Sequence, residues 1–81
     1  MKLRFTRKAV RDYEALSLKL QEPVDKQSTA LLKDIRYPSL NAKKYDNKRD
    51  LWQLRISRDY RLYFLIDSDT YVIITIKKHP K

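Results

Sequence analysis

The chain has 81 residues, no glycine and no cysteine, and its 19 basic residues against 10 acidic ones give a formal net charge of +9. That length allows one hydrophobic core, so we expect a single domain spanning residues 1–81. The lack of glycine excludes glycine-rich phosphate loops, and the lack of cysteine excludes disulfides and thiolate metal sites. The charge favours a polyanionic partner, most commonly nucleic acid, although an acidic protein or an anionic membrane would fit it equally well.

The first half of the chain reads as a strand followed by two amphipathic helices. Residues 2–5 alternate polar and apolar side chains, which predicts a short strand, and Thr6 is a suitable N-cap for the helix that follows. Apolar residues then recur at intervals of three and four as far as Leu20. Pro23 interrupts this pattern and suits the first turn of a second helix, which Pro38 stops. The short link between the helices predicts an antiparallel hairpin.

The second half changes to the alternation that is typical of strands. Residues 39–50 are polar and basic and read as a connection. Three strands are then predicted, over residues 51–57, 60–66 and 70–76, with short turns between them that imply a meander. Because glycine is absent, these turns have to use Asp, Ser or Arg, and Asp is favoured in the left-handed region.

These elements predict an α+β fold of order βααβββ, in which an antiparallel sheet carries the helix hairpin on one face. The sequence shows no secretory signal, and its longest apolar stretches are far too short to span a bilayer. We therefore expect a soluble protein with no membrane partner. The lack of cysteine fits a reducing cytoplasm.

Two arginines of the meander are candidates for binding phosphate. Strand alternation predicts that Trp52, Leu54 and Ile56 face the helices and that Arg55 lies on the opposite face. Arg61 has the matching parity in the next strand, so the two arginines can meet across the hairpin, where a phosphate between them would offset their repulsion. In the alternative interpretation both arginines are solvated or paired with acidic neighbours. Those neighbours are Asp46, Asp50 and Asp59.

His79, the one histidine, follows the last predicted strand among several lysines. We expect it to be neutral, and a neutral imidazole can accept or donate a proton in a cleavage reaction. A lone histidine near a chain end is also commonly an ordinary surface residue, and the sequence leaves both interpretations open. With one histidine and no cysteine we expect no metal site and no cofactor.

Residues 51–63, LWQLRISRDYRLY, resemble the RelE/ParE superfamily of toxins from type II toxin–antitoxin systems. Members carry an aromatic residue, a basic alternating strand, a short turn, and then an arginine in the opening of the next strand. Residues 3–9, LRFTRKA, look like the first strand and helix start of the same family. The resemblance implies a RelE-like fold over the whole chain, and the ribosome-dependent ribonucleases RelE and YoeB look most similar.

The resemblance also implies roles for individual residues. Arg61 matches the arginine that holds the cleaved phosphate, Arg55 matches a basic position on the preceding strand, and His79 matches a basic or histidine position. A functional tyrosine of the relatives is missing where Pro80 and Lys81 stand, so Tyr63 or a lysine would take its role. The expected RNA-binding residues are Lys43, Lys44, Lys48, Arg49, Gln53, Arg58, Lys77 and Lys78.

The implied function is metal-independent cleavage of messenger RNA on the ribosome, by attack of a 2′-hydroxyl on its neighbouring phosphate. Two alternatives remain: a ParE-like toxin that inhibits DNA gyrase without ribonuclease activity, and a non-catalytic nucleic-acid-binding module. The expected partners are the ribosome, mRNA and a cognate antitoxin with an acidic tail. We expect a monomer alone and a hetero-oligomer with the antitoxin.

Overall fold

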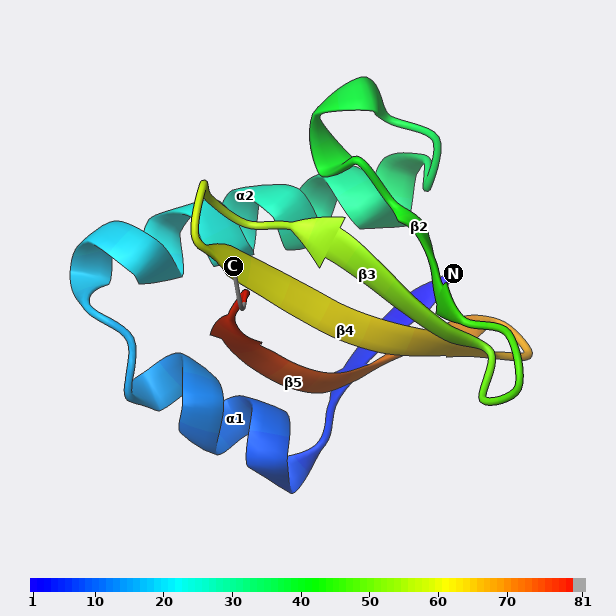
Figure 1. Cartoon of the computed structure of the whole chain (residues 1–81), viewed down its shortest axis with the longest axis horizontal. Coiled ribbons are helices and arrows are strands. Elements are labelled where there is room, and N and C mark those ends of the chain that lie inside the picture. The colour runs from blue at the N-terminus through cyan, green and yellow to red at the C-terminus, as the bar shows by residue number, and fades with distance from the viewer. Residues whose placement is uncertain (80–81) are drawn as a thin grey trace.

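The computed structural model describes residues 1–79, and Pro80 and Lys81, with which the expected domain ends, lie outside the described residues. One sheet of five strands carries two α-helices, which confirms the predicted α+β class (Figure 1). The elements are β1 (Lys2–Phe5), α1 (Arg7–Glu14), α2 (Leu18–Lys33), the short 3₁₀-helix η1 (Pro38–Leu40), β2 (Lys43–Asp46), β3 (Leu51–Arg55), β4 (Tyr60–Asp67) and β5 (Thr70–Lys78). Within residues 1–79, no helix combines the length and apolar composition that a membrane crossing needs.

The sheet has the strand order β1-β5-β4-β3-β2, and the predicted meander forms its antiparallel part. The expectation of a purely antiparallel sheet is wrong at one edge, where β1 pairs parallel with β5 from Lys2–Thr70 to Phe5–Ile73. A parallel pair needs a long crossover between its strands. Both helices and three strands separate β1 from β5 along the chain, and sequence periodicity carries no information on such a pairing.

Strand β2 lies within the segment that we expected to be a connection. It pairs antiparallel with β3, and the register shifts between Lys44 and Asp46. Its sequence, KKYD, lacks an apolar face because β2 is an edge strand with mostly exposed side chains. The β2–β3 and β4–β5 turns use left-handed residues, Asp50 (φ 52°) and Ser68 (φ 57°). Serine therefore takes the left-handed position at residues 67–69, where we favoured aspartate.

The helix boundary differs from the predicted one. α1 ends at Glu14, α2 begins at Leu18, and Pro23 lies inside α2 instead of opening it. The Gln21 side chain ties the link between the helices together, because its Nε2 donates to the carbonyl oxygens of Tyr13 (3.0 Å) and Leu16 (3.3 Å). The Tyr13 carbonyl also accepts from the Leu16 N–H (3.0 Å), so the Leu16 carbonyl is the one that Gln21 supplies with a donor past the end of α1.

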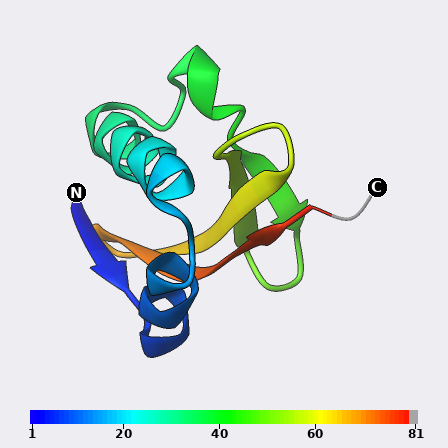
Figure 2. The ribbon, with the colours of Figure 1, turned by 90° about the vertical axis from the view of Figure 1, so that its left-hand side faces the viewer.

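The core lies between the helices and one face of the sheet. Leu54, Leu62 and Ile76 form a row across β3, β4 and β5 in which every side chain is buried. Val24 and Leu31 of α2 belong to the same cluster, and Trp52 and Ile56 pack with it as predicted. In Figure 1 α2 lies behind the sheet, and Figure 2 shows α1 beside β1 and β5. The other sheet face is therefore left uncovered by helices.

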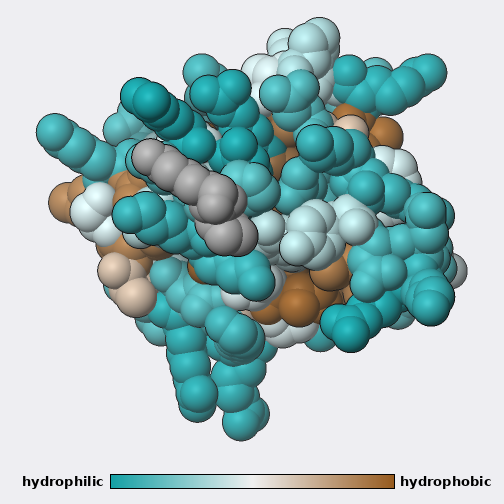
Figure 3. Space-filling model, viewed as in Figure 1, coloured by the Kyte–Doolittle hydropathy of each residue, from teal (hydrophilic) through white to brown (hydrophobic). Residues whose placement is uncertain are grey.

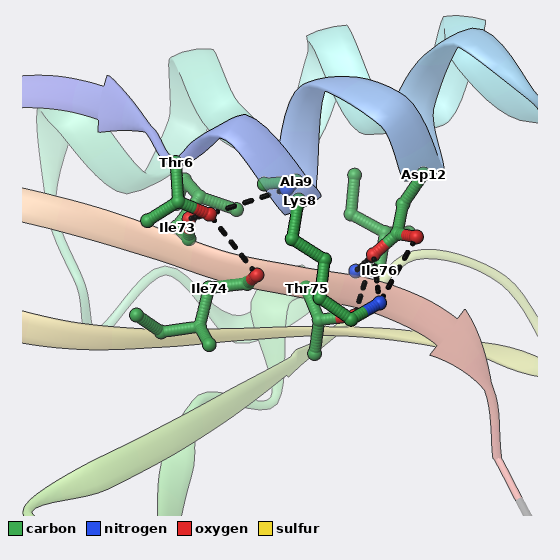
Figure 4. A network of polar contacts seen from close by, with 8 residues as sticks. All are labelled: Thr6, Lys8, Ala9, Asp12, Ile73, Ile74, Thr75 and Ile76. Atoms are coloured by element: carbon green, nitrogen blue, oxygen red, sulfur yellow. Dashed lines mark hydrogen bonds and ion pairs between the residues drawn. The ribbon is translucent and has the colours of Figure 1, made fainter.

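Helix α1 covers the free edge of β5 beyond the end of β1 (Figure 4). Thr6 caps α1 by accepting from the Ala9 N–H, and its hydroxyl lies 2.9 Å from the carbonyl oxygen of Ile73. Asp12 Oδ2 accepts hydrogen bonds from the Thr75 hydroxyl (2.6 Å) and from the Ile76 N–H (3.1 Å). Unpaired strand edges invite pairing with other chains, and these contacts close that route.

The Asp12 contacts make stability depend on pH. Partial burial opposes ionisation of this carboxyl, but the hydrogen bonds from Thr75 and Ile76 and the charge of Lys8 together hold its pKa below its usual range. A carboxyl with a lowered folded-state pKa stabilises the fold above the unfolded-state pKa of about 4, and this contribution is lost as the pH falls through the folded-state value.

We predict that Asp12→Asn lowers the free energy of unfolding at pH 7 by about 1.5–3 kcal/mol, the range for hydrogen bonds to charged groups. The difference from the wild type should shrink below about pH 4, where the wild-type carboxylate also becomes protonated. Urea unfolding at several pH values measures both effects. Asp67→Asn is the matched control, since the exposed Asp67 side chain makes no hydrogen bond or ion pair with described residues. A loss that stays constant from pH 7 to pH 2 would contradict this account.

Candidate functional site

Three cations lie side by side on the sheet face opposite the core. Arg55 of β3 pairs with Arg61 of β4, and Arg61 pairs with Lys77 of β5. This cationic row (Arg55, Arg61 and Lys77) comes one residue after the buried row of Leu54, Leu62 and Ile76, so its side chains point the other way. Arg55 and Lys77 are exposed and Arg61 is half-buried. The prediction that both arginines share the open face is confirmed.

The alternative of acidic partners for these arginines is wrong. Asp50 pairs with Lys44 at 3.0 Å and Asp46 pairs with Arg49 at 3.6 Å. No residue of the cationic row forms an ion pair within residues 1–79. Like charges directly opposite each other destabilise a sheet. An anion bound at the row would remove that penalty.

The Arg61 guanidinium is fixed by the turn between β3 and β4. Its Nη1 donates to the carbonyl oxygens of Ser57 (2.7 Å) and Tyr60 (3.0 Å), with that of Arg58 at 3.4 Å. The Nε and Nη2 groups have no partner among the described residues, and two N–H groups of a guanidinium match two oxygens of a phosphate. Arg61 therefore presents a pre-oriented fork.

A cavity of about 210 Å³ opens beside the arginines. Its lining residues are Asn41, Lys43, Gln53, Arg55, Arg61 and His79. The volume is below the roughly 300–1,000 Å³ of sites for drug-sized ligands, which suits a fragment such as one phosphate with its adjoining sugar. None of its lining residues is acidic, so its chemistry is that of an anion site, with the amide groups of Asn41 and Gln53 and the imidazole of His79 beside the three basic side chains. Within residues 1–79 no cluster of side chains fits a metal ion.

His79 and Gln53 bring unsatisfied polar atoms to this cavity. The His79 N–H donates to the Asp59 carbonyl oxygen, which ties the end of β5 to the β3–β4 turn and holds the imidazole beside the arginines. His79 Nδ1 and Gln53 Oε1 are buried and have no hydrogen-bond partner among the described residues. Buried polar groups without partners are rare in folded proteins, and a bound ligand is one way of satisfying them.

Gln53 and Tyr63 pair across β3 and β4 and are buried, although strand alternation places their side chains on the same sheet face as Arg55 and Arg61. Tyr63 is 2% exposed because Tyr45 packs edge-on against its ring at 5.2 Å and Lys77 Nζ lies 5.2 Å from the ring centre. Burial raises the pKa of the Tyr63 hydroxyl, the neighbouring Tyr45 raises it further, and Arg61 opposes both. Tyr63 is therefore protonated at neutral pH and does not line the cavity.

The expected RNA-binding residues do not form one cluster. Lys43 and Gln53 line the cavity and Lys77 belongs to the cationic row. Lys44 and Arg49 are engaged in the ion pairs with Asp50 and Asp46. The remaining three are exposed and do not line the arginine cavity: Lys48, Arg58 and Lys78.

Two residues near the cavity were not predicted. Asn41 follows η1 in a left-handed conformation (φ 49°), which asparagine tolerates better than most residues, and this preference was the available signal. Gln27 of α2 is 7% exposed, and its Nε2 donates to the carbonyl oxygens of Arg55 (2.8 Å) and Ser39 (2.9 Å). The partners of Gln27 lie 12 and 28 residues away along the chain, so local spacing gives no sign of them.

We predict that Gln27→Leu lowers the free energy of unfolding by about 1–3 kcal/mol. The leucine keeps the volume but leaves two inward carbonyl groups without their donor, which is the costly way to lose a hydrogen bond. Thr29→Val on the exposed side of the same helix turn removes one hydroxyl bond to the Asp25 carbonyl and is the control. Thermal unfolding measures both. Equal losses of stability in the two variants would show that the Gln27 hydrogen bonds contribute no more to the free energy of unfolding than one exposed hydroxyl bond does.

Comparisons with known proteins agree with this architecture. The family model described as the ParE toxin of type II toxin–antitoxin system, parDE, matches residues 3–81. A comparison with the curated proteins finds no significant match.

Solved structures give the same result at the level of the fold. A YoeB/ParE toxin from Agrobacterium tumefaciens superposes with a TM-score of 0.84 at 16% identity, covering 99% of this chain and 100% of that one. The RelBE toxin–antitoxin complex of Escherichia coli gives 0.74 at 18% identity, with 99% and 98% covered. The YoeB–YefM heterotetramer of Staphylococcus aureus gives 0.77 at 16% identity, with 99% and 98% covered.

Proposed function

This chain belongs to the ParE toxin family of type II toxin–antitoxin systems, and on that premise we propose that it is a ribosome-dependent mRNA endoribonuclease that inhibits translation in the cytoplasm. The observation that supports the proposal is the pre-oriented Arg61 fork beside Arg55, in a cavity without acidic lining residues. A phosphodiester is the anion that a polyanionic RNA strand would bring to such a cavity.

The proposed reaction is an internal transfer. The RNA 2′-hydroxyl oxygen forms a bond to the adjacent phosphorus, the bond from phosphorus to the 5′-oxygen breaks, and a 2′,3′-cyclic phosphate and a 5′-hydroxyl result. The His79 imidazole accepts the 2′-hydroxyl proton, and a lysine such as Lys43 supplies the proton that the leaving oxygen takes. Arg61 and Arg55 stabilise the charge that builds on the phosphate oxygens in the transition state.

The ribosome has a defined part in this proposal. Attack in line with the leaving oxygen requires a specific backbone conformation, and a strand held in that conformation reacts far faster than a free one. The arginine cavity of about 210 Å³ holds about one phosphate with its sugar and cannot by itself impose that conformation on the strand. Free RNA is therefore a poor substrate, and message held on the ribosome is the good one.

An antitoxin is the proposed regulator. The solved relatives include toxin–antitoxin complexes, and we propose that an acidic antitoxin segment covers the cationic row in the same way that an RNA phosphate would. Such a segment would stabilise the fold by mass action, because it binds the folded chain alone. The free toxin would be monomeric and the complex hetero-oligomeric.

Inhibition of DNA gyrase is the second candidate. The name of the matching family model favours it. A gyrase inhibitor needs no cleavage chemistry, so it would use the basic face for contact only. In vitro assays separate the candidates, because the ribonuclease cuts message on ribosomes and the inhibitor traps gyrase–DNA complexes.

We predict that Arg61→Ala lowers the rate of message cleavage on programmed ribosomes by roughly a hundred- to a thousandfold, the usual cost of removing one group that stabilises transition-state charge. Arg61→Lys should recover the rate only in part, because an ammonium cannot form the bidentate contact. His79→Ala should cost less than Arg61→Ala.

The matched control is Arg4→Ala, which removes one exposed charge from β1, at the far edge of the sheet. Equal amounts of folded variant are compared, with thermal melts to verify folding. If Arg61→Ala cleaves message at the wild-type rate, the cleavage site lies elsewhere in the chain. If neither protein cleaves message, the proposed reaction is ruled out. A dead His79→Ala with an active Arg61→Ala would reverse the proposed order of the two effects.

A further inference from the structure

Two more cavities adjoin the site and lead away from it across the molecule. One, of about 430 Å³, lies between α2, η1 and the end of β3, and it shares Arg55 with the arginine cavity. The other, of about 300 Å³, lies farther along α2 and shares Lys26, Gln27 and Ser39 with the first. Because neighbouring cavities share lining residues, the three lie next to one another around α2, η1 and the end of β3. We call the part beyond Arg55 the α2–η1 groove, lined by Lys26, Gln27, Lys33, Tyr37 and Ser39.

The charge of this groove matches that of the site. Lys26 and Lys33 project from α2 as exposed residues, and neither forms an ion pair within residues 1–79. No acidic residue lines either of the two cavities. Cations that form no ion pair within residues 1–79 thus line each of the three adjoining cavities.

The groove also offers a platform for stacking. Tyr37 lines its far end and is 49% exposed, although a large aromatic side chain gains most from burial. Proteins that hold single-stranded nucleic acid combine a cationic groove with exposed aromatic rings on which bases stack. Figure 1 shows η1 beside the C-terminal part of α2. Gln27 fixes this arrangement, because it bonds the carbonyl groups of both Ser39 and Arg55.

We propose that the α2–η1 groove binds the single-stranded RNA next to the cleaved phosphate, with Lys26 and Lys33 at backbone phosphates and Tyr37 under a base. The proposal rests on the proposed function in one respect, namely that RNA is the ligand of the arginine cavity. RNA is favoured over an acidic protein segment because the groove combines two cations with an exposed ring and adjoins a phosphate-sized cavity.

The test measures binding of a fluorescein-labelled 2′-O-methyl RNA hexanucleotide to the full chain by fluorescence anisotropy. Methylation blocks the attacking hydroxyl, so binding is read without cleavage. For Lys26→Ala/Lys33→Ala, the slope of log affinity against log salt should become shallower by about 1.4, since each phosphate contact on a single strand contributes about 0.7. Tyr37→Leu should weaken binding about fivefold or more, the lower end for one stacked base.

The matched control is Arg4→Ala/Lys19→Ala, which removes the same charge from exposed residues that line none of the cavities. If the control pair changes the salt slope as much as the groove pair, only overall charge acts and the proposal is overturned. An acidic peptide, oligoglutamate, is titrated in parallel. If the groove pair weakens peptide binding and leaves RNA binding unchanged, the groove is a protein-docking surface and the RNA proposal is also overturned.

Cleavage on programmed ribosomes distinguishes this proposal from the proposed function. If the wild type cuts no message but Lys26→Ala/Lys33→Ala still shows the shallower salt dependence of RNA binding, the ribonuclease function is rejected and the groove proposal is retained. If the wild type cuts message but Lys26→Ala/Lys33→Ala binds RNA and cuts message like Arg4→Ala/Lys19→Ala, the ribonuclease function is retained and the groove proposal is rejected.

Discussion

Opposition of like charges across three strands is the constraint on which the site depends. The registers of β3, β4 and β5 bring Arg55, Arg61 and Lys77 into one row, and such a row is unfavourable in a sheet by itself. It persists because the adjacent row on the other face consists of Leu54, Leu62 and Ile76, which are buried in the core. Fully burying a side chain of this kind contributes about 1.5–3 kcal/mol, more than a repulsive surface pair costs. The core thus fixes the register, and the register holds the cations together on the hydrophilic face that Figure 3 shows.

The residues around the row are held by backbone contacts rather than by counter-charges. Arg61 is anchored on turn carbonyls, Gln27 bonds the carbonyl of Arg55 from below, and the His79 N–H bonds the Asp59 carbonyl. Carbonyl anchors orient a side chain without neutralising it, so the positive potential stays available to a ligand. Pre-oriented charge of this kind needs no reorganisation when an anion arrives, and that is the property that stabilises a transition state.

The sequence predicted the parts of this arrangement that follow from local rules. Strand alternation and a short turn suffice to place Arg55 opposite Arg61, because side chains repeat every two residues and a tight hairpin leaves little choice of register. It did not predict β2, whose polar residues carry no apolar periodicity, nor the burial of Tyr63 beneath Tyr45 and Lys77. The Gln27 bridge joins residues 28 positions apart, and the parallel pairing of β1 with β5 joins the two ends of the chain. Long-range contacts of this kind leave no trace in local spacing.

The central claim is that the uncompensated cations around Arg61 form one phosphate site. Its most direct test is an NMR titration of the ¹⁵N-labelled chain with a dinucleoside monophosphate whose 2′-hydroxyl is methylated, which carries a single phosphate. The account predicts that the side-chain Nε–H signals of Arg55 and Arg61 and the imidazole of His79 shift together with one saturable dissociation constant, while those of Arg4 and Arg7 do not move. Small, unsaturated shifts spread over all the arginines would show a generally basic surface and contradict the claim.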